Sequence, residues 1–203
     1  MRIHRSRVLG ALAALILAGS AMAADAPQIA VVPKGTTHEF WKAIHAGAIK
    51  AERELTAGGM PVEVLWKGPL KEDDRAGQIE VVENFTARGV AGIVLAPLDD
   101  RALVAPVEAA GAANIPVVII DSGLKSERIA SFVATNNHDG GRKAGQRLAA
   151  VLGGTGRVLM LRYQQGSAST ALREAGFLEA IAEHPASPSS AATSTPGRRA
   201  TAR

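Results

Sequence analysis

The 203-residue sequence lacks cysteine and has few aromatic side chains: four Phe, two Trp and one Tyr. Without cysteine the chain can form no disulfide and cannot be lipid-anchored at a cysteine. The lack of disulfides does not exclude an oxidising compartment, which permits them but does not require them. Beyond residue 23 the sequence also has no apolar run long enough to cross a bilayer. These absences indicate a protein without covalent cross-links that is not embedded in a membrane.

The N-terminal segment has the pattern of a secretory signal peptide. Three arginines, Arg2, Arg5 and Arg7, precede the apolar run VLGALAALILAGS, and the small residues AMA follow it. The pattern predicts cleavage after Ala23 and a mature protein outside the cytoplasm.

The high isoelectric point, about 9.8, comes from the two ends of the chain. Six of the 23 Lys and Arg residues lie in the terminal segments, whereas all 19 Asp and Glu residues lie between Asp25 and Glu183. The central part is therefore slightly acidic. It offers no basic face for a nucleic acid, so we expect no nucleic-acid partner.

Short apolar runs alternate with longer segments of helical spacing. Val- and Ile-rich runs of this kind are typical of strands that are covered on both faces of a sheet. The repeated alternation predicts an α/β fold with a parallel sheet and helical crossovers. The predicted strands are 28–32, 62–66, 92–96, 116–120, 131–135 and 157–161.

The first strand leads into two adjacent aromatic residues. Thr36 and Glu39 have the spacing of a capping box, which places Phe40 and Trp41 in the first turn of a helix. Ligands of open α/β sheets bind beyond the carboxyl ends of the strands, so the pair is expected beside a binding site. Neighbouring helical residues point about 100° apart, so one ring can face the cleft while the other faces the core. A purely structural role for both rings stays open.

Charged residues follow two later strands. Asp121 ends the fourth strand and can accept hydroxyl hydrogen bonds, or it can cap a turn. Arg173 lies near the start of the helix that follows the sixth strand, with Ser169 or Thr170 as its cap, and can donate to hydroxyls or extend into solvent. Aromatic rings, a carboxylate and a guanidinium at one sheet edge suit a sugar, because sugar C–H faces pack on rings and hydroxyls pair with charged planar groups.

At these residues the chain resembles the periplasmic sugar-binding proteins of ABC transporters, of the ribose-binding type. The similarity runs from Gln28 to about His184 and is carried by IAVVPKGTTHEFW, ENFTARGVAGIVLAPLDD, ANIPVVIIDSG, FVATNNHDGGRKAG and GSASTALREAGF in that order. The resemblance implies the type I fold of these proteins, two Rossmann-like lobes with parallel sheets that close on a sugar. It also implies roles for eight residues: ligand contacts by Phe40, Trp41, Asp121, Ser122, Asn137 and Arg173, and a hinge at Thr135 and Asn136.

Two positions depart from the ribose-type pattern. Ser122 stands where those proteins usually carry Arg, and Thr37 and His38 replace an Asn before the aromatic pair. The departures weigh against ribose itself and leave the sugar class unchanged.

The sequence predicts four segments. They are a signal peptide (1–23), a first lobe (24–135), a partial second lobe (136–185) and a tail (186–203) that is either disordered or read out of frame. Only one clear strand precedes Pro185 in the second lobe, and the tail has no periodic apolar face. We therefore expect the second lobe to be incomplete, with poor or absent binding, unless the short form dimerises to cover its apolar faces.

The predicted function is capture of a monosaccharide in the periplasm for the membrane subunits of an ABC importer, by a monomer that closes its lobes about a hinge. Two alternatives remain: a receptor that passes a sugar or furanone to a sensor, and a truncated family member that does not bind. The five His residues have no metal-ligand spacing, and GSAST is no nucleophile elbow. We expect neither an enzyme nor a cofactor.

Overall fold

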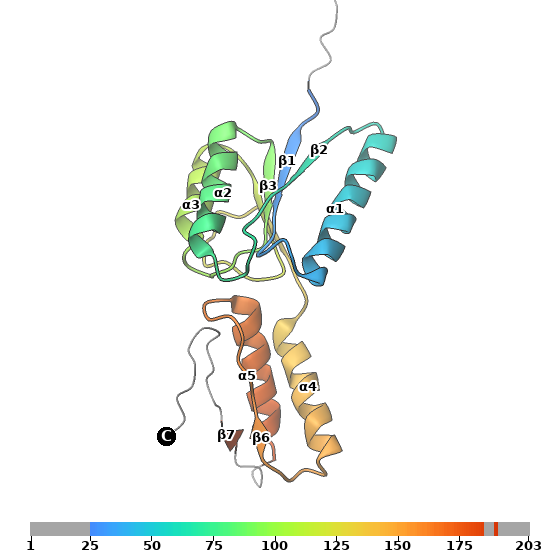
Figure 1. Ribbon diagram of the computed structural model, residues 1–203, viewed down its shortest axis with the longest axis vertical. Helices are drawn as coiled ribbons and strands as arrows, with labels where there is room; N and C mark the ends of the chain where they lie inside the picture. The colour runs from blue at the N-terminus through green and yellow to red at the C-terminus, as the bar shows by residue number, and fades with distance from the viewer. Residues whose placement is uncertain (1–24, 185–188, 191–203) are drawn as a thin grey trace, which may run out of the picture.

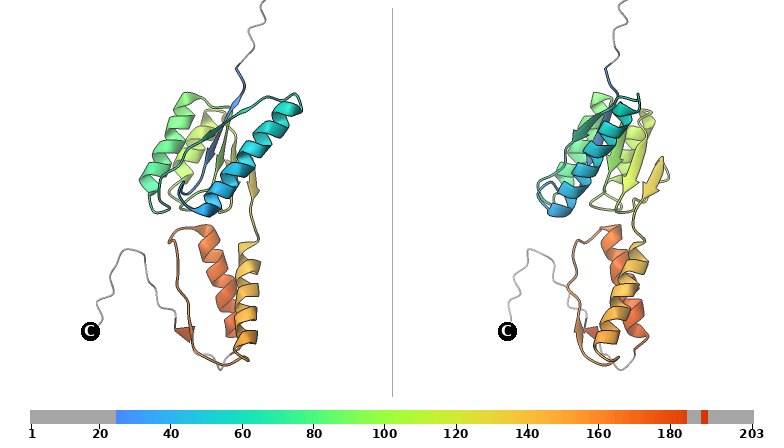
Figure 2. Two further views of the ribbon diagram at one scale, coloured as in Figure 1. Left: turned by 45° about the vertical axis from the view of Figure 1, so that its right-hand side comes forward. Right: turned by 90° about the vertical axis from the view of Figure 1, so that its right-hand side faces the viewer.

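The computed structural model describes residues 25–184 and the backbone of Ser189 and Ser190. The predicted signal peptide, residues 1–23, lies outside the described residues, as does most of the predicted tail. The described chain forms two parts, which we call the first lobe (25–135) and the second lobe (136–184 together with Ser189 and Ser190). They are stacked end to end and joined by the chain between β5 and α4 (Figures 1 and 2).

The first lobe is built on a parallel five-stranded sheet in the order β2-β1-β3-β4-β5. Its strands are β1 (Gln28–Val32), β2 (Glu63–Trp66), β3 (Gly92–Leu95), β4 (Val117–Ile120) and β5 (Ser131–Val133). Its helices are α1 (Glu39–Ala57), α2 (Arg75–Arg88) and α3 (Val104–Ala112). The predicted parallel α/β fold is confirmed in this lobe. The strand order changes direction between β1 and β3, and such a switch point opens a crevice at the carboxyl ends of the strands.

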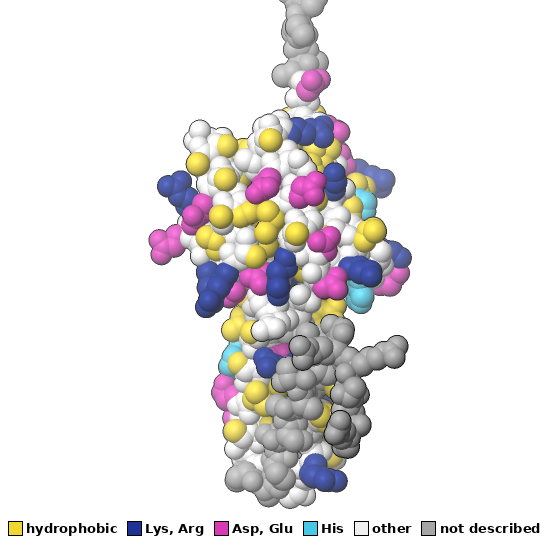
Figure 3. Space-filling view, turned by 60° about the vertical axis from the view of Figure 1, so that its left-hand side comes forward, with side chains coloured by type: hydrophobic (Ala, Val, Ile, Leu, Met, Phe, Trp, Pro, Cys, Tyr) yellow, Lys and Arg dark blue, Asp and Glu magenta, His cyan; other side chains and the backbone are white. Residues whose placement is uncertain are grey.

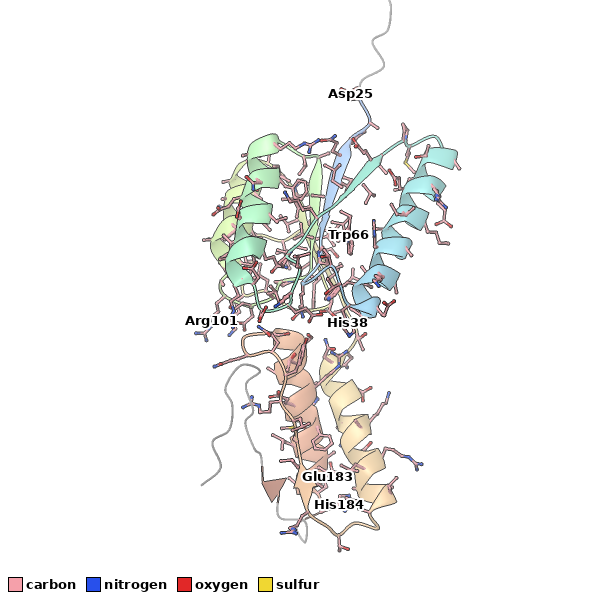
Figure 4. The ribbon with its side chains drawn as sticks, viewed as in Figure 1. Asp25, His38, Trp66, Arg101, Glu183 and His184 are labelled. Atoms are coloured by element: carbon pink, nitrogen blue, oxygen red, sulfur yellow. The ribbon has the colours of Figure 1, made fainter. Side chains whose placement is uncertain are left out.

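The main core lies between the sheet and the pair α2 and α3, with α1 on the other side of the sheet (Figure 1). The inward positions alternate along each strand: Ala30 and Val32 on β1, Ile93 and Leu95 on β3. Burial of each Val, Ile or Leu side chain in this core stabilises the fold by about 1.5–3 kcal/mol. On the α1 side, the ring of His45 stacks on that of Trp66 with centroids 4.4 Å apart, and Figure 4 shows Trp66 between α1 and the sheet.

The second lobe consists of two long helices and a short strand pair. Its elements are α4 (Asn137–Val151), β6 (Val158–Leu159), α5 (Ala168–Ala182) and β7 (Ser189–Ser190), with β6 and β7 parallel. The two helices pack along each other closely. A Cβ at Gly141 would clash with the carbonyl oxygen of Arg173, and one at Gly176 with that of His138. The missing side chains at these glycines therefore permit the close helix contact.

Several local expectations were wrong. The strand expected at 157–161 is reduced to Val158–Leu159. The side chains of Leu159 and Leu161 are largely exposed. Thr36 does not cap α1, because its hydroxyl donates to the carbonyl of Pro69 instead. The cap is His38, whose Nδ1 accepts from the backbone N–H of Phe40.

Candidate functional site

A cavity of about 300 Å³ lies at the carboxyl ends of the strands, between the two lobes. The first lobe contributes residues from the β1–α1 loop, the start of α1, the β2–α2 loop and the end of β4. The second lobe contributes the β6–α5 loop and the first turns of α5. Figure 4 shows His38 at the edge of the first lobe that faces the second. The lining residues are Lys34, His38, Phe40, Trp41, Glu72, Asp121, Tyr163, Gln164, Ser167, Ser169, Thr170 and Arg173.

The two adjacent aromatic residues have different environments. Phe40 is 47% exposed, whereas Trp41 is 2% exposed, and their rings meet edge to face at 4.9 Å. Trp41 is thus the core-facing member of the pair. Phe40 offers the free ring surface on this wall of the cavity.

Glu72 was not anticipated from the sequence. Its Oε1 accepts from the indole N–H of Trp41 at 2.6 Å, and its Oε2 lies 3.4 Å from the hydroxyl of Tyr163, across the gap between the lobes. Burial and the negative charge of Glu72 raise the pKa of Tyr163, so the phenol stays protonated and donates. Tyr163 is also the exposed aromatic ring that the second lobe brings to the cavity. Neither residue has a sequence signal, because both lie in loops that only the fold brings together.

Asp121 lies in the cavity wall as expected, but its nearest charged partner is Lys34. The Nζ of Lys34 is 2.8 Å from Oδ2 of Asp121, and both side chains are largely buried. The backbone of Asp121 is in the left-handed region with φ of 62°, which is uncommon for a residue other than glycine. Strain of this kind often marks functional positions. Lys34 was overlooked because a lysine after a strand normally extends into water.

A polar seam joins the lobes beside this pair. Ser167 is the N-cap of α5, and the first N–H groups of a helix need acceptors. The expected caps, Ser169 and Thr170, lie inside the helix instead. The N–H of Ser169 donates to the hydroxyl of Ser122 at 3.0 Å, so the first lobe caps a helix of the second. Ser122 is 1% exposed and does not line the cavity.

A second group of contacts between the lobes surrounds the β6–α5 loop. The guanidinium of Arg75 donates to the carbonyl of Gln165 at 2.7 Å. The backbone N–H of Asp100 donates to the carbonyl of Gly166 at 2.9 Å. Asp99 pairs with Arg75 at 3.0 Å. Burial alone would raise the pKa of Asp99, but hydrogen bonds from the backbone of Ala102 and Arg101 and the charge of Arg75 outweigh it and lower that pKa. The ionised Asp99 thus pairs with Arg75, which contacts the β6–α5 loop.

The remaining predicted residues take three positions. Thr135 and Asn136 lie where the chain crosses between the lobes, and Asn136 caps α4 by accepting from the N–H of Asp139. Asn137 is buried outside the cavity lining, where it donates to the carbonyl of Asp121. Arg173 lines the cavity from the second lobe, whereas Asp121 lines it from the first, and Arg173 has no ion-pair partner among the described side chains.

Other kinds of site find little support in the described part of the chain. Residues 25–184 contain no group of three His, Cys, Asp or Glu that could hold a metal ion. The same residues include no helix with both the length and the apolar character to span a bilayer. Acidic and basic side chains are interspersed over the face around α2 and α3 (Figure 3).

A cleft between two α/β lobes, lined by aromatic and charged side chains, defines a ligand-binding protein of the two-lobed class. Comparison with known families agrees: the periplasmic binding protein domain matches residues 29–199. The chain belongs to this family of solute-binding proteins, which are not enzymes, and the fold is the type I fold that the resemblance implied.

Individual relatives are similar over most of this chain. The ribose import binding protein of Haemophilus influenzae is 29% identical over 87% of the chain and 59% of its own length. The D-ribose/D-allose-binding protein of Pseudomonas aeruginosa is 32% identical over 77% of the chain and 50% of its own length. The chain therefore spans only about half to three-fifths of these relatives.

Solved structures give the same result. A carbohydrate transporter solute-binding protein from Agrobacterium radiobacter in complex with D-arabinose superposes with a TM-score of 0.78 at 33% identity, over 84% of this chain and 58% of that one. An ABC transporter solute-binding protein from Agrobacterium vitis with bound D-fucose superposes with a TM-score of 0.74 at 31% identity, over 80% of this chain and 56% of that one.

Proposed function

We propose that this protein captures a monosaccharide outside the cytoplasm and delivers it to the membrane subunits of an ABC importer. The observation that carries the proposal is the cavity between the lobes. Phe40 and Tyr163 bring aromatic rings from opposite lobes, and Asp121 and Glu72 bring carboxylates. Arg173 brings a guanidinium that has no ion-pair partner among the described side chains. A pyranose or furanose needs this combination of apolar faces and in-plane hydrogen-bonding groups.

The size of the cavity supports a small ligand. A volume of about 300 Å³ lies at the lower end of the range typical of small-molecule sites. The named relatives bind ribose, allose, arabinose and fucose, all monosaccharides. We infer a monosaccharide for this chain as well.

The binding step in this proposal is a rotation of the lobes about Thr135 and Asn136. The described chain crosses between the lobes there, and the contacts from Ser122, Arg75 and Asp100 to the second lobe are hydrogen bonds that water can replace on opening. Hinges of this kind change φ and ψ at a few residues at the ends of secondary-structure elements. Export through residues 1–23 and transfer to importer subunits complete the proposed role.

A thermal-shift screen followed by isothermal titration calorimetry tests the proposal on the purified protein. The panel contains D-ribose, D-allose, D-arabinose, D-fucose and common hexoses. A sugar at a hundred times its Kd adds about 2.7 kcal/mol to the free energy of unfolding. Glycerol at equal hydroxyl concentration controls for general co-solvent stabilisation, and Arg173→Met should reduce the shift. Flat calorimetric titrations for every sugar would overturn the proposal.

A further inference from the structure

Lys34 places a buried positive charge in the wall of the proposed sugar site. The residue is 5% exposed and follows β1 by two positions. Its ammonium has three acceptors: Oδ2 of Asp121 at 2.8 Å and the hydroxyls of Ser167 and Ser169 at 3.2 Å each. An ammonium has three N–H donors, so none remains for a ligand. Lys34 therefore acts on a ligand through Asp121 and through its own charge.

The pairing changes what Asp121 can offer. One carboxylate oxygen is engaged by Lys34, and the side chain, 18% exposed, still lines the cavity. The second oxygen can accept a hydrogen bond from a ligand. Since Lys34 and Asp121 neutralise each other, the site has no net negative charge at this point to attract a cation.

We infer that Lys34 is a specificity-determining residue: it holds Asp121 in position to accept from a ligand hydroxyl and excludes a ligand ammonium from the same place. The inference rests on the proposed function. An amino group bound to Asp121 would lie close to the ammonium of Lys34 in a largely water-free wall, where repulsion between like charges is weakly screened. The ligand class is thereby narrowed to sugars that carry a hydroxyl, and not an amine, at the position facing Asp121.

The test compares each ligand with its own charged analogue. The neutral sugar that stabilises the wild-type protein most in the screen is taken together with its monoamino-monodeoxy analogues, one for each hydroxyl, and Kd is measured for all of them. The wild type should bind the analogue whose amine replaces the hydroxyl facing Asp121 at least tenfold more weakly than the neutral sugar. In Lys34→Met, the ratio of the Kd of this amino analogue to the Kd of the neutral sugar should fall at least tenfold.

Three further variants test whether a change in this Kd ratio comes from the charge of Lys34 beside Asp121. Lys42→Met removes one exposed positive charge outside the cavity and should leave the ratio unchanged. Lys34→Met/Asp121→Asn should lose the gain in amine binding, because the carboxylate that attracts the amine is gone. Lys34→Gln retains amide donors for Ser167 and Ser169 without the charge. It is the variant measured if circular dichroism shows that Lys34→Met does not fold.

The outcomes separate the two proposals. If Lys34→Met and Lys34→Gln weaken neutral and amino sugars in equal proportion, Lys34 only joins the lobes and the inference is wrong. It is also wrong if the wild type binds an amino analogue at every position as tightly as the neutral sugar. If the wild type binds no neutral sugar at all, the proposed function fails and the inference falls with it.

Discussion

The indole N–H of Trp41 donates a 2.6 Å hydrogen bond to Oε1 of Glu72, which joins the start of α1 to the β2–α2 loop in the wall of the cavity. Trp41 is 2% exposed, whereas its neighbour Phe40 is 47% exposed. The two aromatic residues are therefore not interchangeable. Trp41 supports the wall, and Phe40 supplies its free surface.

Substitution of the pair should separate these roles in stability. Trp41→Ala should lower the free energy of unfolding by about 3–5 kcal/mol, because it leaves a large cavity and removes the donor to Oε1 of Glu72. Phe40→Ala should cost less than about 1 kcal/mol, since half of its ring is already in water. Urea denaturation measures both values, and equal losses would show that the pair forms one structural unit.

Phe40 should matter more for sugar binding than for stability. Phe40→Ala should weaken the affinity for the best monosaccharide by about 1–3 kcal/mol, through lost stacking and apolar burial. Phe132→Ala is the matched control, because Phe132 is similarly exposed but lies on β5, outside the cavity lining. Calorimetry that finds full affinity in Phe40→Ala would contradict the assignment of Phe40 as the platform.

Replacing only one residue of the Lys34–Asp121 ion pair should lower the stability of the fold. Asp121→Asn leaves the buried ammonium without its counter-charge and should destabilise the protein by about 3–5 kcal/mol. Lys34→Met/Asp121→Asn removes both charges and should recover at least half of that loss. Chemical denaturation of wild type, both single variants and the double variant gives the coupling energy, and strictly additive losses would argue against a tight pair.

Neighbouring glycines at the start of α4 offer a direct test of the contact between α4 and α5. Gly141→Ala places a methyl group against the backbone of Arg173 and should cost about 1–3 kcal/mol or more. Gly140→Ala meets nothing within 4 Å and should be neutral or raise stability by up to about 1 kcal/mol through better helix propensity. Thermal melts distinguish the two, and a tolerated Gly141→Ala would mean that the helices can separate without cost.

Acid should weaken the fold in part through Asp99. Its pKa is lowered in the folded chain despite burial, because Ala102, Arg101 and Arg75 favour the ionised form. A lowered folded pKa gives stability that is complete above the unfolded value, about 3.9, and is lost as pH falls through the folded pKa. Asp99→Asn should therefore flatten the dependence of stability on pH below about pH 4. Asp25→Asn, at an exposed position, is the control, and an unchanged pH profile in Asp99→Asn would contradict this role.

The sequence by itself determined the fold class and the edge of the sheet where the site lies. Strand β1 begins and ends at the predicted residues, and the other first-lobe strands differ only at their ends. Buried parallel strands are read easily, because continuous Val- and Ile-rich runs have few other places in a folded chain. Phe40, Trp41 and Asp121 could be placed together because the carboxyl ends of the parallel strands of one sheet share one edge, whereas Arg173 enters from α5 of the second lobe.

Only the tertiary structure decided how the side chains at that edge divide their roles. Lys34, Glu72 and Tyr163 are brought together from three loops, and their hydrogen bonds and ion pair join residues far apart in the chain. The period of the sequence says nothing about such pairs. Likewise, α5 is capped by Ser122 of the other lobe, because the N–H groups of a helix start take whichever acceptor the packing brings near.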